Sequence, residues 1–174
     1  MTGEVQGNLL GATAGAGADI YLSIRTKRAG ELKGEASAKG HQNAIAAHGF
    51  RFGVSAGSAL GSGQATARRQ YKQLVVSKRL DSSSTSLMSV LATNDEIKDL
   101  RLALRKPGGD QDDFFTLSLS GARVVGLDLD CNEHGETLEQ VSFAFTRVEI
   151  EYRVQGSDGV LGAANRFSDE LLPA

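Results

Sequence analysis

Apolar and polar residues alternate along much of this chain, which is the pattern of a strand with one buried face. In residues 19–24, DIYLSI, the side chains of Ile20, Leu22 and Ile24 share one face. The stretch ARRQYKQLVVSK, with the apolar residues Leu74, Val75 and Val76 toward its end, is a further strand candidate. The same alternation recurs at Phe50, Phe52, Val54, Leu100, Leu102, Leu104, Phe115, Leu117, Leu119, Val125, Leu127 and Leu129. The pattern predicts a mostly β chain with several long strands.

The alternation is disturbed at two places. Gly121 and Arg123 interrupt the apolar face of residues 115–129, which predicts a bend midway along that run. In residues 141–154 the apolar set moves from odd to even positions near Thr146 and Arg147. A slip of one residue moves side chains to the opposite face of a strand. We therefore expect a β-bulge, or a strand that serves two sheets of a barrel.

One segment follows a helical period instead. In DSSSTSLMSVLATNDE, Leu87, Val90 and Leu91 have the i, i+3, i+4 spacing of one helix face. The serines before them could cap the first free backbone N–H groups. We expect one helix of about three turns, with Leu87 and Leu91 closing part of the core. Long strands with a single helix predict a closed or nearly closed β-barrel with a helical flank.

Composition and charge argue against several classes of function. The 174 residues suit one domain, and a formal net charge of −2 gives no bulk electrostatic reason to expect nucleic acid or an anionic membrane. Cys131 is the single cysteine, so an internal disulfide is excluded. No apolar run approaches a membrane span, and the N-terminus lacks the basic and apolar regions of a signal peptide. We expect no membrane insertion and no cleaved export signal.

The glycine-rich stretch GSALGSGQAT, residues 57–66, lies between two strand candidates. A phosphate-binding P-loop would need a lysine after its second glycine and a helix behind it, and this stretch has neither. The G-x-G-x-x-G pattern also fails, because Thr66 stands where its last glycine belongs. We interpret the stretch as a flexible loop that contacts something larger than a phosphate.

The acidic stretch DLDCNEHGETLE resembles a calcium-binding EF-hand loop. Asp128, Asp130, Asn132 and Glu139 occupy its oxygen-ligand positions, but Glu133 replaces the glycine required for its sharp turn. Strand-like rather than helical segments flank it, so a solvated acidic hairpin is the favoured interpretation.

Other candidate chemistry is weak. Cys131 and His134 do not complete a metal site, His41 and His48 stand alone, and the basic residues after the glycine loop lack stacking aromatics for single-stranded nucleic acid. We predict no catalytic residue, no cofactor and no metal, and hence no enzyme.

Several stretches in order resemble the Hcp family, the haemolysin-coregulated proteins that form the inner tube of the bacterial type VI secretion system. They are DIYLSI; GEASAKGH with Gly34, Glu35 and His41; IAAHGFRFGVS; SKRLDSSSTSLMSVLATNDEI; and LEQVSFAFTRVEIEYRVQGSDG. From the first stretch to the last, residues 19–159, the resemblance spans about four-fifths of the chain. Three departures stand out: no proline begins the helix, phenylalanines replace the frequent tryptophans, and residues 1–18 exceed the usual N-terminal length.

The resemblance implies a fold and a function. The fold would be a two-sheet closed β-barrel with one short α-helix, with a flexible tail at residues 1–18, the barrel domain at residues 19–159 and a C-terminal tail at residues 160–174. The protein would form hexameric rings that stack into a tube, which a contractile sheath ejects behind a spike protein. The lumen would carry effectors. The protein would assemble in the bacterial cytoplasm and be secreted without a signal peptide.

In this family a loop between early strands contacts the neighbouring ring, and residues 57–69 match it by position. The expected ring-to-ring contact residues are Gly57, Ser58, Leu60, Gly61, Gly63, Gln64, Arg68 and Arg69. Two other functions remain open at this stage. One is a tail-tube protein of another contractile injection system. The other is a monomeric β-barrel that binds a carbohydrate ligand or calcium.

Overall fold

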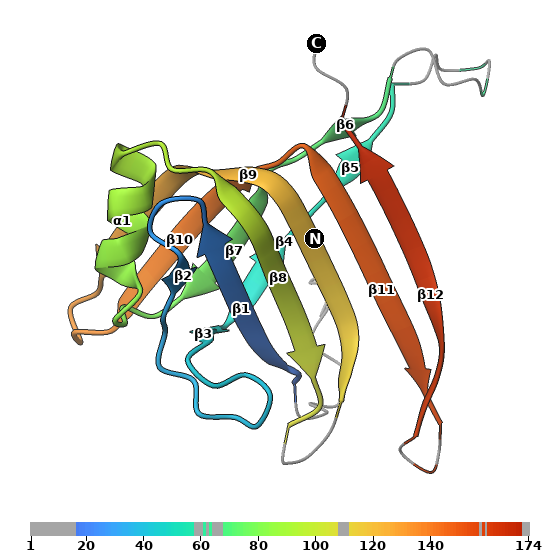
Figure 1. The fold of residues 1–174 in the computed structure, drawn as a ribbon, viewed down its shortest axis with the longest axis horizontal. Coiled ribbons are helices and arrows are strands. Elements are labelled where there is room, and N and C mark those ends of the chain that lie inside the picture. The colour runs from blue at the N-terminus through green and yellow to red at the C-terminus, as the bar shows by residue number, and fades with distance from the viewer. Residues whose placement is uncertain are drawn as a thin grey trace, which may run out of the picture.

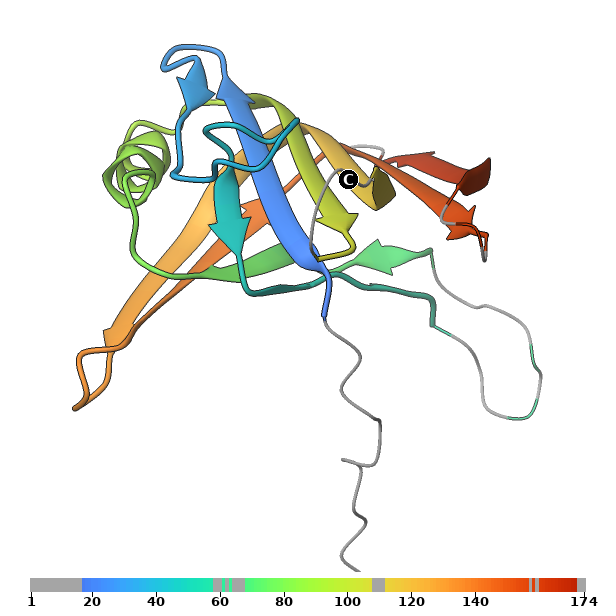
Figure 2. The same ribbon diagram turned by 90° about the horizontal axis from the view of Figure 1, so that it is seen from below.

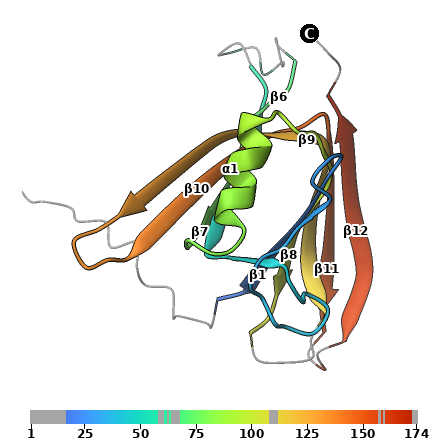
Figure 3. The same cartoon turned by 60° about the vertical axis from the view of Figure 1, so that its left-hand side comes forward.

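The computed structural model describes residues 17–57, 61, 63, 68–107, 112–156, 158 and 160–171. Most of the described chain is β-strand, with one helix, α1 (Ser84–Ala92). Figure 1 shows the strands arranged in two layers that share the long strand β9, and Figure 3 shows α1 across the end where these layers diverge. The mostly β fold with one short helix is confirmed.

The first sheet is antiparallel. Its strand order is β2 (Glu31–Leu32), β1 (Asp19–Thr26), β8 (Ile97–Arg105), β9 (Asp113–Cys131), β11 (Arg147–Gln155) and β12 (Leu161–Glu170), with β3 (Ile45–Ala47) also beside β1.

The second sheet contains the far half of β9, β10 (Thr137–Ala144), β7 (Leu74–Lys78) and β4 (Gly49–Arg51). A separate two-stranded hairpin joins β5 (Val54–Ser55) to β6 (Gln70–Tyr71).

Strand β9 passes from one sheet to the other at Gly121. It pairs with β11 up to Ser120 and with β8 up to Ala122, and from Arg123 onward it pairs with β10. Gly121 has φ 56°, and a Cβ at this position would collide with the side chain of Thr146. Only glycine combines this left-handed backbone with so close a neighbour. The predicted bend is confirmed.

The predicted register change near residue 146 lies beside Gly121, where the chain passes between the two sheets a second time. Strand β10 ends at Ala144 in the second sheet, and β11 begins at Arg147 in the first. Between them, the backbone N–H of Thr146 donates to the Ser120 carbonyl over 3.2 Å. The chain changes sheet at this point, and the apolar residues change from odd to even positions at the same point. As a result, the apolar side chains of both β10 and β11 face the same core.

The strands do not close into a barrel among the described residues. The pairing path runs open from β2 through β9 to β4, and β12 pairs only with β11. Strand β4 has three residues, while β5 and β6 leave the second sheet to pair with each other. The expected hydrogen-bonded closure is thus replaced by an open, two-sheet, barrel-like sandwich.

The core lies between the two sheets and under α1. It comprises Leu22, Ile24, Leu32, Ile45, Leu74, Val76, Leu87, Val90, Ile97, Leu100, Leu102, Leu117, Leu119, Ala122, Val124, Val141, Phe143, Phe145 and Val148. The predicted alternating positions of β1, β8 and β9 supply much of this set. By contrast, Leu129 and Leu91 were predicted on apolar faces but are 44% and 37% exposed. Leu91 is therefore a correction: Leu87 and Val90 are the residues by which α1 closes the core.

The helix does not begin with the predicted serine cap. Ser83 at the N-cap makes no side-chain capping bond. Its hydroxyl instead donates 2.5 Å to Asp81, whose carboxylate also accepts the Ser83 N–H over 2.9 Å. The hydroxyl of Ser84 donates 2.5 Å to Glu139 on β10. Both serines are buried, and their hydroxyls donate to the carboxylates of Asp81 and Glu139, which need hydrogen-bond donors away from water.

Beneath α1 lies a buried ion pair. Lys78 at the end of β7 and Glu139 on β10 are both 0% exposed, and Lys78 Nζ lies 2.9 Å from Glu139 Oε2. Lys78 Nζ also lies 3.0 Å from Asp81 Oδ1 and donates 3.0 Å to Ser84 Oγ. We call Lys78, Asp81, Ser84 and Glu139 the buried lysine cluster. Its contacts connect α1 to β7 and β10.

Residues 160–174, expected as a C-terminal tail, contain β12. This strand pairs with β11 from Arg147–Glu170 at one end to Gln155–Leu161 at the other. Its sequence, LGAANRFSDE, has one large apolar residue away from its first position, Phe167, and hence no alternation that predicts a strand. The backbone of β11 supplies the pairing instead.

Candidate assembly surfaces

The base of the glycine-rich loop is fixed to the end of β12. The hairpin of β5 and β6 extends from one corner of the molecule, where the end of β12 also lies (Figures 1 and 2). Arg69, just before β6, forms a two-point ion pair with Asp169, in which Arg69 Nη2 donates 2.6 Å to Asp169 Oδ1. The hydroxyl of Tyr71 donates 2.7 Å to Asp169 Oδ2. We call Arg69, Tyr71 and Asp169 the loop-base cluster.

Electrostatics favour an ionised Asp169. Hydrogen bonds from Arg69, and then from Tyr71, lower the pKa of the Asp169 carboxyl from 3.8 to about 2. The same contact raises the pKa of Arg69, while burial raises that of Tyr71. The loop base is therefore held by a charged carboxylate at all pH values well above 4.

The structure places only part of the predicted ring-to-ring loop. Gly57, Gly61, Gly63, Arg68 and Arg69 are exposed, and Gly61 and Gly63 have φ of 93° and 67°. Ser58, Leu60 and Gln64 lie outside the described residues. Asp169, which holds the loop base, was not predicted, because it lies 100 residues from Arg69 and no local motif marks it.

The sheet edge formed by β11 and β12 carries exposed apolar side chains. Strand β12 is ten residues long and lies at the edge of the first sheet (Figures 1 and 3). On the core-facing side of this pair, Tyr152 is 45% exposed, Val154 53% and Phe167 48%. The rest of β11 buries this side: Val148 is 0% exposed and Ile150 packs against the core. The side of this strand pair that faces the core thus carries apolar residues beyond the point where the core covers them.

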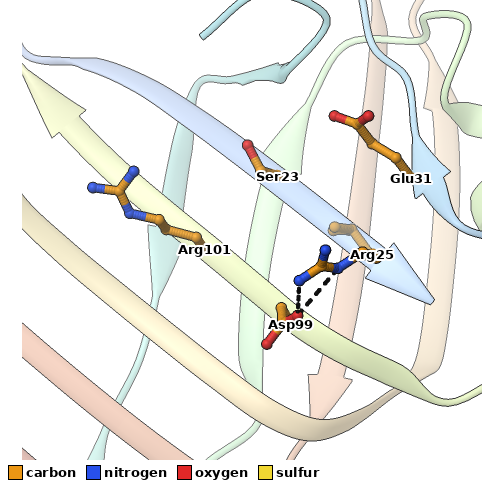
Figure 4. Close-up of a pocket in the computed structure, with 6 residues that line it drawn as sticks. Ser23, Arg25, Glu31, Asp99 and Arg101 are labelled. Carbon is orange, nitrogen blue, oxygen red and sulfur yellow. Dashed lines mark hydrogen bonds and ion pairs between the residues drawn. The ribbon is translucent and has the colours of Figure 1, made fainter. Parts of the chain in front are cut away.

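The outward face of the first sheet is polar. A hollow of about 310 Å³ on β1 and β8 is lined by Ser23, Arg25, Glu31, Asp99 and Arg101, and Arg25 Nη2 lies 2.6 Å from Asp99 (Figure 4). This contact raises the pKa of Arg25. Farther along the face, hydrogen bonds from Arg153 and Arg166 lower the pKa of Glu151. The charges pair with each other across strands, which gives this face a solvated, mixed-charge surface.

The segments compared with a calcium loop and a metal site do not converge. Glu139, at the last EF-hand position, points into the buried lysine cluster, while the Asn132 carboxamide oxygen accepts the N–H groups of His134 and Glu136 within its own turn. In the described part of the chain, no three His, Cys, Asp or Glu side chains gather in a metal-binding arrangement. No helix in that part is long and apolar enough to cross a membrane.

The stretches that carried the family resemblance meet in space. Glu35 accepts the backbone N–H of Ser82 over 3.1 Å, which joins the GEASAKGH connection to the start of α1. At Gly34 a Cβ would lie 2.5 Å from the Ala44 carbonyl oxygen, so this close approach needs glycine. His41 is 5% exposed, stacks on Tyr21 with 4.4 Å between ring centroids, and lies 2.7 Å from Asp113. The connection is fixed to the first sheet at one end and to the helix at the other.

Comparison with known proteins decides the family. The family model described as "Type VI secretion system effector, Hcp" matches residues 21–152. The chain belongs to the Hcp family. A curated relative, the "Major exported protein" of Pseudomonas aeruginosa strain PAO1, is 25% identical over 130 residues, which cover 70% of this chain and 76% of that protein.

Solved structures of type VI secretion proteins share the fold. A structure described as a type six secretion system protein has a TM-score of 0.79 at 23% identity, covering 88% of this chain and 96% of that one. Hcp1 from Salmonella typhimurium has a TM-score of 0.71 at 20% identity, covering 89% of this chain and 95% of that one. Both matches cover almost the whole length of the solved structure, so the described architecture is the fold of those proteins.

Proposed function

We propose that this protein is a structural, non-enzymatic subunit of a type VI secretion tube. Rings of six copies stack into a tube that is driven out by a contractile sheath behind a spike protein. Its lumen carries effectors, and the subunit leaves the cell as part of the tube. Family membership supports the general role, and the name of the exported relative from Pseudomonas aeruginosa is consistent with secretion.

One observation carries the assembly step: the long edge strand β12 with the apolar side chain of Phe167 beside it. An unpaired edge presents backbone N–H and C=O groups that bind another strand or surface. Phe167 is 48% exposed on the core-facing side, so a second copy that covers this edge also removes an aromatic ring from water. A ring requires such contacts to repeat head to tail between different surfaces of neighbouring copies.

The assembly test compares two substitutions on adjacent residues of β12. Phe167→Glu places a charge on the apolar side, whereas Ser168→Glu places the same charge on the opposite, exposed side. Light scattering and negative-stain images should show six-fold rings with an open centre for the wild type and for Ser168→Glu. Phe167→Glu should shift the mass to the monomer. A wild-type protein that stays monomeric over a wide concentration range contradicts the proposal.

The stacking role of the glycine loop needs a separate variant. Replacing residues 58–67 by a short Gly-Ser link keeps Arg68 and Arg69, so that the loop-base cluster stays intact. We expect hexameric rings that no longer stack into tubes. A shift to monomers would instead assign the loop to contacts within the ring, and unchanged stacking would remove it from the ring-to-ring interface.

A further inference from the structure

A hollow of about 420 Å³ lies where the chain enters β1. Its lining includes Ala18, immediately before β1, together with Phe114 at the start of β9 and Tyr152 and Val154 near the end of β11. Lys106 and Arg153 also line it. The hollow therefore combines exposed apolar side chains with two basic ones at the point where residues 1–16 join the described structure.

The sheet itself is incomplete beside this hollow. Pairing between β9 and β11 ends at Phe115–Tyr152, but β11 continues to Gln155 with β12 as its partner. Among the described residues, the part of β11 beyond Tyr152 pairs only with β12. Val154, at 53% exposed, lies on this part, and Tyr152, at 45% exposed, is the last residue before it that pairs with β9. An apolar strand end with a free edge is a site that another segment of chain can cover.

We propose that the N-terminal segment, residues 1–16 of the same chain, binds in this hollow, with Leu9 and Leu10 against Tyr152 and Val154. Leu9 and Leu10 are the only adjacent large apolar residues in a segment otherwise rich in glycine, alanine and polar residues. Ala18 is eight positions after Leu10, and at about 3.3 Å per residue these eight steps span up to roughly 26 Å. The leucines can therefore reach the hollow, whose wall contains Ala18 itself.

Two considerations favour the segment of the same chain over a second copy. A short flexible tether holds a segment near its site at an effective concentration on the order of millimolar, above the concentrations at which separate subunits usually meet. In addition, Glu4 is the one charged side chain of residues 1–16, and its sign is opposite to that of Lys106 in the hollow. The inference goes beyond the proposed tube function, because it holds for a single subunit.

A disulfide trap tests the contact. In the full chain with Cys131→Ser, which removes the one native thiol, Leu10→Cys is combined with Val154→Cys. Under mild oxidation we expect an intrachain disulfide, with a monomer mass and a rate independent of protein concentration. The matched control combines Leu10→Cys with Ser168→Cys on the opposite side of the sheet, and it should react at least tenfold more slowly. Equal rates, or a disulfide that joins two chains, would overturn the proposal.

A second reporter covers the case in which the cysteine variants fold poorly. The chain has no tryptophan, so Leu10→Trp provides a single emission signal. We expect blue-shifted emission that moves to the solvent-exposed wavelength when Tyr152 and Val154 are both changed to Ser. Emission at the exposed wavelength with Tyr152 and Val154 intact also overturns the proposal. Neither readout depends on ring formation, so failure here is distinguishable from failure of the tube function.

Discussion

Two carboxylates, Glu139 and Asp169, hold distant parts of the chain together, but water reaches only one of the sites. Glu139 pairs with Lys78 where both side chains are 0% exposed, whereas Asp169 pairs with Arg69, whose side chain is 49% exposed. A buried charge that loses its partner keeps its full desolvation cost, while an exposed one returns to water. The first site therefore supports the whole fold, and the second fixes the position of one loop.

The largest effect should come from removing the buried cation. Lys78→Met has a similar length but leaves Glu139 without a counter-ion in the interior, which should lower the free energy of unfolding by about 3–5 kcal/mol. Urea denaturation at one fixed protein concentration measures this, since assembly also adds stability.

The double variant Lys78→Met/Glu139→Leu is the control for this prediction. It removes the fully buried pair and leaves only Asp81, whose side chain is 11% exposed, without the lysine, so much of the lost stability should return. If Lys78→Met alone lowers the free energy of unfolding by less than about 1 kcal/mol, the loss is no larger than that expected for an exposed ion pair. The proposed difference between the buried and the exposed site would then be wrong.

A smaller and more local effect is expected at the loop base. Asp169→Asn removes the charge that Arg69 binds, and so should speed tryptic cleavage after Arg68 and Arg69 severalfold with little change in the urea midpoint. Glu170→Gln is the matched control, because the neighbouring side chain is exposed and Arg69 contacts only the Glu170 carbonyl. Cleavage that is equally slow in both variants would show that other contacts hold the loop.

The same contact should respond to acid. The folded pKa of Asp169, about 2, is below its ordinary value of 3.8, so its stabilising contribution is fully present above about pH 4. It is lost as the pH falls from about 4 towards 2. The stability difference between the wild type and Asp169→Asn should shrink over this interval in acid titrations of unfolding, and a constant difference would contradict it.

The smallest effect is predicted on the outward face of the first sheet. Arg147 Nη2 lies 2.7 Å from Glu149, and these side chains are 53% and 54% exposed. Arg147→Ala should change the free energy of unfolding by less than about 1 kcal/mol, and less still in high salt. A loss as large as that of Lys78→Met would mean that distance, not burial, sets the strength of these pairs.

The amino-acid pattern alone predicted the strands whose apolar residues alternate, the single helix, the bend at Gly121 and the register change near Thr146. These features are encoded locally, because side-chain period and glycine backbone freedom act over a few residues. An ordered series of stretches also indicated the Hcp family, which the family comparison confirmed. Local pattern did not predict β12, whose sequence does not alternate and whose pairing depends on β11.

Only the tertiary structure decided which polar groups meet. Lys78 and Glu139 are 61 residues apart, and Arg69 and Asp169 are 100 apart. Their partners depend on how the two sheets pack, and no spacing in the sequence records that. For the same reason the sequence placed Leu91 in the core and Glu139 in a surface hairpin, whereas the structure leaves the leucine exposed on α1 and buries the glutamate beside Lys78. Burial is a property of the assembled layers, whereas the strand and helix periods are properties of the chain.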